Sequence, residues 1–480
     1  MMYDIVIIGA GVVGGMIALT LAKYNLRLCL VERENDVATG ATKANSAIVH
    51  AGFDAKPGSL KAQLNVKGSQ MMKTVCEELG VKYKNNGSLV VGFNDEDRAT
   101  LCDLLERGIQ NGVPGLRIVE KDELRRMEPH LSDTVVCALE APTGAIVCPY
   151  DLAIAAIGNA MDNGADLMCN FEVCRIDKTE NGYRVCSPTD CIDTRFVINC
   201  AGLYSDKIAA LIGDASFAVH ARRGEYILLD KDCGELTSRT VFQTPSKMGK
   251  GILVSPTVDG NLLLGPTSVD INDKENKTTT QNGFDDILVK AGASIDRIPL
   301  NKSIASFCGL RAVGTTGDFI IHSPKAGFIN VAGIESPGLS ASPAIAAYVV
   351  DMLRAQGASL SDNPHYDPIR KPIHAFRTMS QDEKNAVIRA NPAYGKIVCR
   401  CEGVTEGEIL EAIRRNPKAT DLDGVKRRTR AQMGRCQGGF CSPYITELLA
   451  AELQIPYEQV TKFGRASAVN VARTKKGGQS

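Results

Sequence analysis

The sequence lacks a net charge, an export signal and a membrane-length apolar run. Its 55 lysines and arginines balance its 55 aspartates and glutamates, so the overall charge gives no argument for a nucleic-acid or membrane partner. The amino terminus enters the strand-like run "YDIVIIGAG" directly, without a basic leader or a cleavage site. We therefore expect a globular cytoplasmic protein with no transmembrane segment.

A disulfide framework is not expected either, although the chain has 16 cysteines. Twelve of them stand singly in apolar strings such as "LRLCLVE" and "ASFCGLR". Free cysteine is among the most often buried residue types, so these twelve are expected to be small buried side chains in a reducing compartment.

A nucleotide-binding motif opens the chain. An apolar run over residues 5–8 is typical of a buried parallel strand, and Gly9, Gly11 and Gly14 follow it in GxGxxG spacing. Gly9 permits the tight turn, Gly11 lets the backbone approach a pyrophosphate, and Gly14 lets the following helix pack closely. A second strand ends at Glu32, which is placed to accept hydrogen bonds from ribose hydroxyls. This complete βαβ unit predicts dinucleotide binding.

Two later segments bear on which dinucleotide it is. "TRFVINCAGLYSD" (194–206) is a strand leading into two small residues, and "GFINVAGIESPGLSASPAIAAYVVDML" (327–353) is a strand, a glycine-punctuated loop and a helix. Both resemble the distal flavin motifs of the FAD-dependent glycerol-3-phosphate dehydrogenase and D-amino-acid oxidase superfamily. The resemblance implies FAD, with the amino terminus of the second helix facing the pyrimidine end of the flavin. The flavin contacts it implies in these segments and before them are Val173, Ala201, Gly202, Gly333, Gly338, Leu339 and Ser340.

The segment "GATKANSAIVHAGFD" (40–54) extends this resemblance. It implies that Thr42, Asn45 and Ser46 line the flavin and that His50 lies near the reacting carbon. A lone histidine is more often a structural residue, but an imidazole in this setting can accept an alcohol proton near neutral pH.

The region between the flavin segments has the pattern of an antiparallel sheet, including a hairpin at Asp259-Gly260. Arg223 of "RRGEY" and Arg311 of "GLRAVGTTGD" are candidates for binding an anionic substrate, because a guanidinium binds phosphate or carboxylate bidentately. In the superfamily, an arginine in a similar "GLR" stretch contacts the substrate anion, although Ala312 replaces the usual proline here. The alternative is that both arginines form surface salt bridges.

Near the carboxyl terminus, four cysteines form the pattern C-x-C, 34 residues, C-x4-C: Cys399, Cys401, Cys436 and Cys441. Zinc sites usually show two C-x2-C knuckles. The pattern resembles the bacterioferritin-associated-ferredoxin-like (BFD-like) 2Fe-2S domain of anaerobic glycerol-3-phosphate dehydrogenase large subunits, and four thiolates are the ligands such a cluster requires. Ser442 and Pro443 suit the first positions of a following helix. Zinc and unliganded thiols remain alternatives.

The stretch "KRRTRAQMGR" places five cations beside these cysteines. They would stabilise a dianionic cluster. The alternatives are a solvated helix face and a docking patch for an acidic partner. No aromatic side chain is interleaved with the cations, so we expect no nucleic-acid binding.

The expected fold class is α/β, or α+β overall: a Rossmann-like FAD-binding domain, an antiparallel-sheet substrate domain of the D-amino-acid oxidase and glutathione reductase type, and a small helical 2Fe-2S domain. FAD-binding segments are expected at 1–80, 145–215 and 325–355, substrate-domain segments at 80–145 and 215–325, a linker or strap at 356–395, the 2Fe-2S domain at 396–450 and a tail at 451–480.

These parts predict a FAD-dependent dehydrogenase. The resemblance implies oxidation of sn-glycerol 3-phosphate to dihydroxyacetone phosphate, with 2-hydroxy acids such as 2-hydroxyglutarate, or amino acids, as alternative substrates. A flavin accepts a hydride whereas a 2Fe-2S cluster carries one electron, and the chain has one GxGxxG, so we expect the electrons to leave singly to a partner. The resemblance implies that this partner is a second flavoprotein or a membrane-associated subunit, which would hold the chain at the inner face of the membrane. A redox or assembly subunit without turnover is the alternative from another class.

Overall fold

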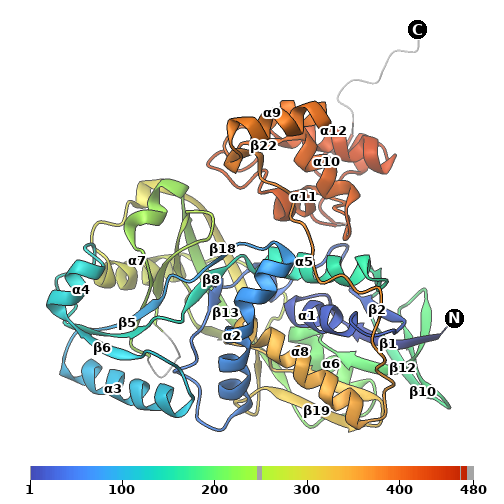
Figure 1. The fold of residues 1–480 in the computed structure, drawn as a ribbon, viewed down its shortest axis with the longest axis horizontal. Helices are drawn as coiled ribbons and strands as arrows, with labels where there is room; N and C mark the ends of the chain where they lie inside the picture. The colour runs from blue at the N-terminus through green and yellow to red at the C-terminus, as the bar shows by residue number, and fades with distance from the viewer. Residues whose placement is uncertain (1, 246–250, 465, 473–480) are drawn as a thin grey trace.

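The computed structural model describes residues 2–245, 251–464 and 466–472. It contains two large sheets side by side, with a small helical domain above them (Figure 1). The first sheet carries the nucleotide motif and the second is largely antiparallel. The fold class expected from the sequence is confirmed.

The first sheet is built around β1 (Met2–Ile8), which pairs in parallel with β2 and with β12. Helices α1, α5 and α8 pack together in one apolar core, and α2 packs on α8. The other strands of this sheet are β2 (Leu28–Val31), β9 (Asp166–Met168), β10 (Arg175–Thr179), β11 (Gly182–Cys186), β12 (Cys191–Asn199), β19 (Ile320–Lys325) and β20 (Phe328–Ala332). The helices of this half are α1 (Val12–Leu21), α2 (Leu60–Leu79), α5 (Pro149–Asp162), α6 (Ser205–Ala210) and α8 (Gly338–Ala355).

The second sheet forms the other half of the body, and its longest pair is β13 against β18. Its strands are β5 (Ser88–Gly92), β6 (Arg117–Glu120), β7 (Cys137–Ala141), β13 (Val219–Leu229), β14 (Thr240–Gln243), β15 (Leu253–Pro256), β16 (Leu262–Gly265), β17 (Val269–Ile271) and β18 (Ser303–Gly314). Helices α3 (Asp95–Gln110), α4 (Lys121–Met127) and α7 (Gln281–Ser294) accompany it. A small sheet of β3 (Ile48–Val49), β8 (Ala145–Val147) and β4 (Tyr83–Lys84) lies in the same part of the chain.

After α8 the chain runs along the body and enters the carboxyl-terminal domain, where α11 lies nearest to α5 (Figure 1). This domain contains α9 (Gln381–Ala390), β21 (Ile397–Cys399), β22 (Val404–Thr405), α10 (Glu406–Arg414), α11 (Leu422–Thr429) and α12 (Ser442–Leu453). Two expected boundaries differ from the structure. The strap at 356–395 includes α9, and the tail from 451 includes the last turn of α12 and the buried Val460; residues 473–480 lie outside the described part.

The expectation of twelve separate buried cysteines is wrong in part. Cys186 and Cys191 are joined by a disulfide, because they are cross-strand partners on β11 and β12 five residues apart. Cys102 and Cys174 are exposed, and Cys169 is half-buried. Among the described helices, none combines the length and the apolar composition that crossing a membrane requires.

Candidate active site and cysteine cluster

The glycine loop after β1 is packed too tightly for larger residues. Gly9 has a φ of 105°, and a Cβ there would lie 2.5 Å from the Cys200 carbonyl oxygen. A Cβ at Gly14 would lie 2.1 Å from the Gly9 carbonyl oxygen. At Gly11 the nearest atom to such a Cβ is the Thr42 hydroxyl, at 3.2 Å. The tight turn and close helix packing expected at Gly9 and Gly14 are both present, which is what a pyrophosphate cradle requires.

The chain brings its other expected nucleotide contacts to the same edge of the sheet. Because β1, β12 and β20 are neighbouring parallel strands, the residues after them (Gly9, Ala201-Gly202 and Gly333) share the carboxyl edge, where such sheets bind ligands. Glu32 follows β2 at this edge. Phe171 donates its backbone N–H to the Glu32 carbonyl oxygen, which brings the segment of Val173 alongside.

Glu32 and Thr42 hold the loop together from the inside. The Glu32 carboxylate accepts hydrogen bonds from the backbone N–H of Ala10 (2.9 Å) and of Glu34 (3.1 Å), and burial raises its pKa. The buried Thr42 hydroxyl accepts from the Val12 N–H at 3.0 Å, in the first turn of α1. Both side chains therefore lie where they can contact a nucleotide while fixing the loop that would bind it.

Asn45 and Ser46 follow Thr42 along the chain and connect the glycine loop to the second sheet. The Asn45 side chain donates to the Thr42 carbonyl oxygen at 2.8 Å and accepts from the Ala47 N–H at 2.8 Å, which fixes the turn. The Ser46 and Tyr226 hydroxyls are 3.1 Å apart. The structure thus joins the loop of residues 40–54 to β13.

His50 lies where the two distant flavin segments meet. Its backbone N–H donates to the Ser340 hydroxyl at 2.7 Å, and its Nε2 is 3.3 Å from the Ser336 hydroxyl. Ser340 is fully buried and also donates to the Ile48 carbonyl oxygen. Gly338, Leu339 and Ser340 form the first turn of α8, whose amides have no acceptor within the helix. These contacts place His50 beside a helix amino terminus that can stabilise negative charge on a reduced flavin.

His50 faces a cavity of about 350 Å³ between the two sheets. Among the described residues that line it, four are cationic and two are carboxylates: Lys56, Lys61, Arg222, Arg311, Asp54 and Glu335. Lys61 pairs with Glu335 at 2.6 Å, and Arg222 pairs with Asp270 at 2.6 Å. Arg311 donates to the Thr267 carbonyl oxygen and, within the part of the chain that is described, has no carboxylate within 4.0 Å. The cavity therefore favours an anion.

Of the two arginines expected to bind the anion, the structure places one in the cavity. Arg311 lines it, but Arg223 lies on the opposite face of β13, 3.1 Å from Glu225. Its neighbour Arg222 lines the cavity instead, because Arg222 is the direct cross-strand partner of Arg311. Side chains alternate along a strand, so the register of β13 against β18, which the sequence does not give, decides between the two. Lys61 and Phe242, which no motif contains, and Ser336, which lies within the 327–353 segment but was not singled out, were not predicted from the sequence.

The four clustered cysteines come together as two pairs. The Cys399 and Cys441 thiols are hydrogen-bonded to each other, as are those of Cys401 and Cys436. The hydrogen bond from Cys441 lowers the pKa of Cys399 to about 6. The two thiol pairs together supply the four thiolates that a 2Fe-2S cluster requires.

Backbone amides donate hydrogen bonds to two of these thiols. The N–H groups of Gly438, Gly439 and Phe440 point at the Cys436 sulfur, and those of Glu402 and Gln432 at Cys399. Such donors stabilise thiolates and cluster sulfurs. The following helix begins at Ser442 with Cys441 as its N-cap, one residue earlier than expected.

Most of the basic stretch beside the cysteines is not a solvated face, although Arg435 is 71% exposed. Arg427 and Arg428 are buried and both bind Asp36 of the first domain, Arg428 at 2.7 Å. Arg430 binds Asp259 at 2.8 Å, and Arg435 binds Asp230 at 2.6 Å. Four of the five cations therefore form ion pairs between domains.

Comparisons with known proteins agree with this geometry. The sequence profile of the FAD dependent oxidoreductase family, DAO, matches residues 4–352, and that of the BFD-like [2Fe-2S] binding domain matches residues 397–451. A glycerol 3-phosphate dehydrogenase of Caloramator mitchellensis is 48% identical over 476 residues, covering 99% of each chain. The human mitochondrial L-2-hydroxyglutarate dehydrogenase is 32% identical over 289 residues, covering 56% of this chain and 61% of that protein.

A solved structure shares the larger part of the fold. The dithionite-reduced L-alpha-glycerophosphate oxidase from Mycoplasma pneumoniae with FAD bound superposes with a TM-score of 0.73 at 30% identity, covering 77% of this chain and 99% of that one. The cofactors are therefore FAD, held by the first domain, and a 2Fe-2S cluster in the carboxyl-terminal domain.

Proposed function

We propose that this chain, which belongs to the family of FAD-dependent oxidoreductases and carries a BFD-like 2Fe-2S domain, oxidises sn-glycerol 3-phosphate to dihydroxyacetone phosphate. The observation that carries the proposal is the cavity in which His50 and Arg311 face the same space with an excess of positive charge. The similarity to the Caloramator glycerol 3-phosphate dehydrogenase over nearly the whole chain supports this substrate.

FAD, when bound, supplies a two-electron hydride acceptor. The chain's own residues would bind the substrate and handle its proton. Arg311 would hold the phosphate, because its guanidinium forms paired charge-assisted hydrogen bonds and lies in the cavity without a carboxylate partner among the described residues. His50 Nε2 would accept the proton of the C2 hydroxyl, with Ser336 3.3 Å away to orient the ring. The first turn of α8 would stabilise the negative charge that develops on the flavin side.

The electrons would leave through the 2Fe-2S cluster, held by Cys399, Cys401, Cys436 and Cys441. A 2Fe-2S cluster carries one electron, so each substrate oxidation would require two successive transfers to a protein that accepts single electrons. The chain contains one GxGxxG motif, which supports a separate partner rather than internal transfer to NAD. That partner would be a second flavoprotein or a membrane-associated subunit.

A 2-hydroxy acid is the second candidate substrate. The similarity to L-2-hydroxyglutarate dehydrogenase covers 56% of the chain, and the arginines of the cavity would bind a carboxylate as readily as a phosphate. His50 would act in the same way on either alcohol.

An anaerobic titration of flavin absorbance separates these functions. Bleaching by sn-glycerol 3-phosphate alone is the expected result. Bleaching by L-2-hydroxyglutarate alone would show that a 2-hydroxy acid is the substrate, and the proposed roles of His50 and Arg311 would still apply. If neither compound bleaches the flavin while FAD and cluster are both bound, the dehydrogenase proposal fails and a subunit without turnover becomes the better interpretation.

A further inference from the structure

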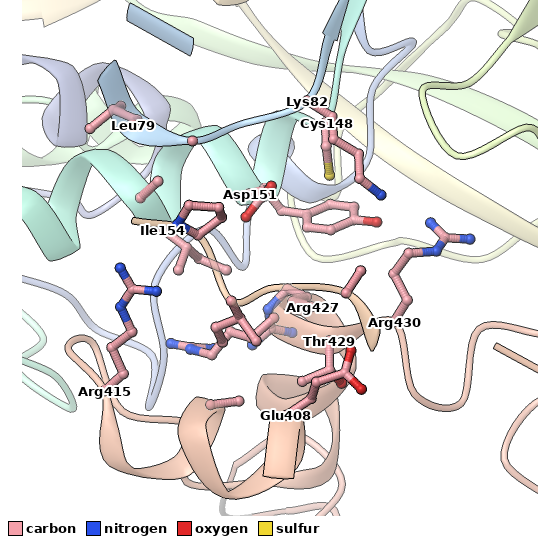
Figure 2. A pocket seen from close by; sticks show the side chains of 18 of the residues that line it. Leu79, Lys82, Cys148, Asp151, Ile154, Glu408, Arg415, Arg427, Thr429 and Arg430 are labelled. Carbon is pink, nitrogen blue, oxygen red and sulfur yellow. The ribbon is translucent and has the colours of Figure 1, made fainter. Parts of the chain in front are cut away.

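The carboxyl-terminal domain is fixed to the rest of the chain by buried ion pairs at two places. One is Asp36 of the first domain, which accepts from Arg427 and Arg428, with Asn35 donating to Asp421 at 2.6 Å beside it. The other is the hairpin between β15 and β16 of the second domain. Figure 2 shows this interface around a cavity of about 120 Å³, with Lys82 and Cys148 on the body side and α11 opposite.

At the hairpin, Asp259 accepts from three cations of different segments. They are Lys82 (2.6 Å), Arg377 (2.9 Å) and Arg430 (2.8 Å). The Asp259 side chain is only 5% exposed and that of Arg430 14%, so this pair is shielded from water, whereas Lys82 is 44% exposed. The hairpin tip is thereby tied to both the strap and the end of α11.

The same cations reach the loop that carries the cysteines. Glu402 directly follows Cys401 and is 1% exposed, and it accepts from Arg377 (2.8 Å), Arg430 (3.1 Å) and Lys231 (2.8 Å). Arg430 therefore bridges Asp259 and Glu402. The second cysteine loop has a weaker contact with the body, since Arg435, which precedes Cys436, pairs with Asp230 at 2.6 Å but is 71% exposed.

A buried ionic network of this kind is weak evidence for stability. Desolvation of the charges offsets most of their attraction, so such networks are better explained by the geometry they impose. Here the network fixes the position of the cysteine loops relative to the first two domains. Arg430 is the C-cap residue of α11, and its own backbone has a left-handed conformation with a φ of 69°.

A chain of contacts joins the flavin-lining loop to the cysteine loops at the docked interface. The Val147 N–H donates to the Ala47 carbonyl oxygen at 3.0 Å, in the loop of residues 40–54. Three residues later, the Tyr150 hydroxyl donates to the Met433 sulfur at 3.6 Å. Met433 stands three residues before Cys436. A path of contacts therefore runs from the loop of residues 40–54 through residues 147–150 to Met433, three residues from Cys436.

We propose that Arg430, by bridging Asp259 and Glu402, is a positioning residue that holds the 2Fe-2S domain in the arrangement through which electrons pass from the flavin to the cluster. This rests on the proposed function. Each substrate gives two electrons to the flavin; one electron at a time reduces the cluster, which an external one-electron acceptor protein must reoxidise between the transfers. Loss of the bridge should slow the internal transfer and leave substrate oxidation intact.

The test compares Asp259→Asn and Arg430→Gly with the wild-type holoenzyme. Glycine suits the backbone at position 430, so that variant removes the guanidinium without strain at the helix end. Asp193→Asn is the matched control, because Asp193 pairs with Arg184 in an exposed hairpin far from this interface in the sequence. Substrate is mixed anaerobically with each protein, flavin bleaching is followed by absorbance, and cluster reduction is followed by rapid-freeze electron paramagnetic resonance.

In both variants we expect bleaching within about twofold of wild type and cluster reduction slowed at least about tenfold, because the relative position of donor and acceptor sets the rate of transfer between them. Hydrogen exchange should also increase in the strap and in α11, while the control behaves as wild type. Cluster reduction at the wild-type rate in both variants would overturn the inference. A wild-type cluster that stays oxidised after the flavin has bleached would instead refute the proposed electron route.

Discussion

Arg222 and Arg311 lie directly opposite each other on the antiparallel strands β13 and β18, and both line the cavity that contains His50. Arg222 forms an ion pair with Asp270, whereas Arg311 donates to the Thr267 carbonyl oxygen and is hydrogen-bonded to Tyr226. The two arginines therefore differ in what they can offer an anion. Among the described residues Arg311 has no carboxylate within 4.0 Å, and Arg222 adds positive potential beside it.

Arg311→Gln should raise the KM for sn-glycerol 3-phosphate by about 10- to 150-fold, because a hydrogen bond to a charged group contributes roughly 1.5–3 kcal/mol. Arg223→Gln is the matched control on β13, since Arg223 faces Glu225 on the other side of the sheet. It should leave KM within about twofold. Steady-state kinetics of both variants check this, and equal effects on KM would contradict the assignment.

His50→Ala should retain FAD and slow flavin bleaching by about 10²-fold or more, the range expected for loss of a general base. The measurement is the rate of anaerobic bleaching at saturating substrate across pH. His365→Ala, on the exposed part of the strap, provides the control. Bleaching at the wild-type rate in His50→Ala would remove His50 from the reaction.

Cys436→Ser should abolish the 2Fe-2S cluster and reduction of an acceptor protein, while substrate still bleaches the flavin. The reason is that the four cysteines lie in the carboxyl-terminal domain and the flavin segments in the first. Iron content and the visible spectrum report the cluster, and Cys102→Ser, at an exposed thiol of α3, is the control. Loss of FAD together with the cluster would mean that the two sites do not form independently.

Asp36→Asn should reduce stability in a pH-dependent way. Burial raises the pKa of Asp36, but Arg428 and Arg427 outweigh burial and hold it at about 2. An aspartate with a lowered folded pKa contributes stability that is fully present above its unfolded pKa of about 3.9 and is lost as the pH falls toward 2. Removing one partner of a buried pair costs about 3 kcal/mol, so the variant should unfold at a lower Tm at pH 7.

The difference in Tm between wild type and Asp36→Asn should then shrink as the pH is lowered from 4 to 2. Thermal unfolding followed by circular dichroism measures it. Asp286→Asn, which breaks an exposed pair with Lys290 on α7, should change Tm little at any pH. A difference that stays constant down to pH 2 would show that Asp36 is not acting through its charge.

The sequence by itself determined the parts that depend on local pattern. The glycine spacing at residues 9–14 predicts a nucleotide-binding turn because only glycine fits that turn. The two close pairs of cysteines predict a metal or cluster site because its ligands come from short stretches of the chain. These signals predicted the Rossmann unit, the antiparallel domain and the cysteine-containing domain, and with the resemblance they predicted FAD and the cluster.

Tertiary structure decided what depends on register and on contacts between distant segments. The register of β13 against β18 decides that Arg222, and not Arg223, faces the cavity. A shift of one residue along the strand would exchange its two faces. The basic stretch after residue 425 could equally have been solvated, and only its approach to Asp36 and Asp259 made it an interface. Burial and pairing are properties of the packed chain, since each needs a partner whose distance in space the sequence does not specify.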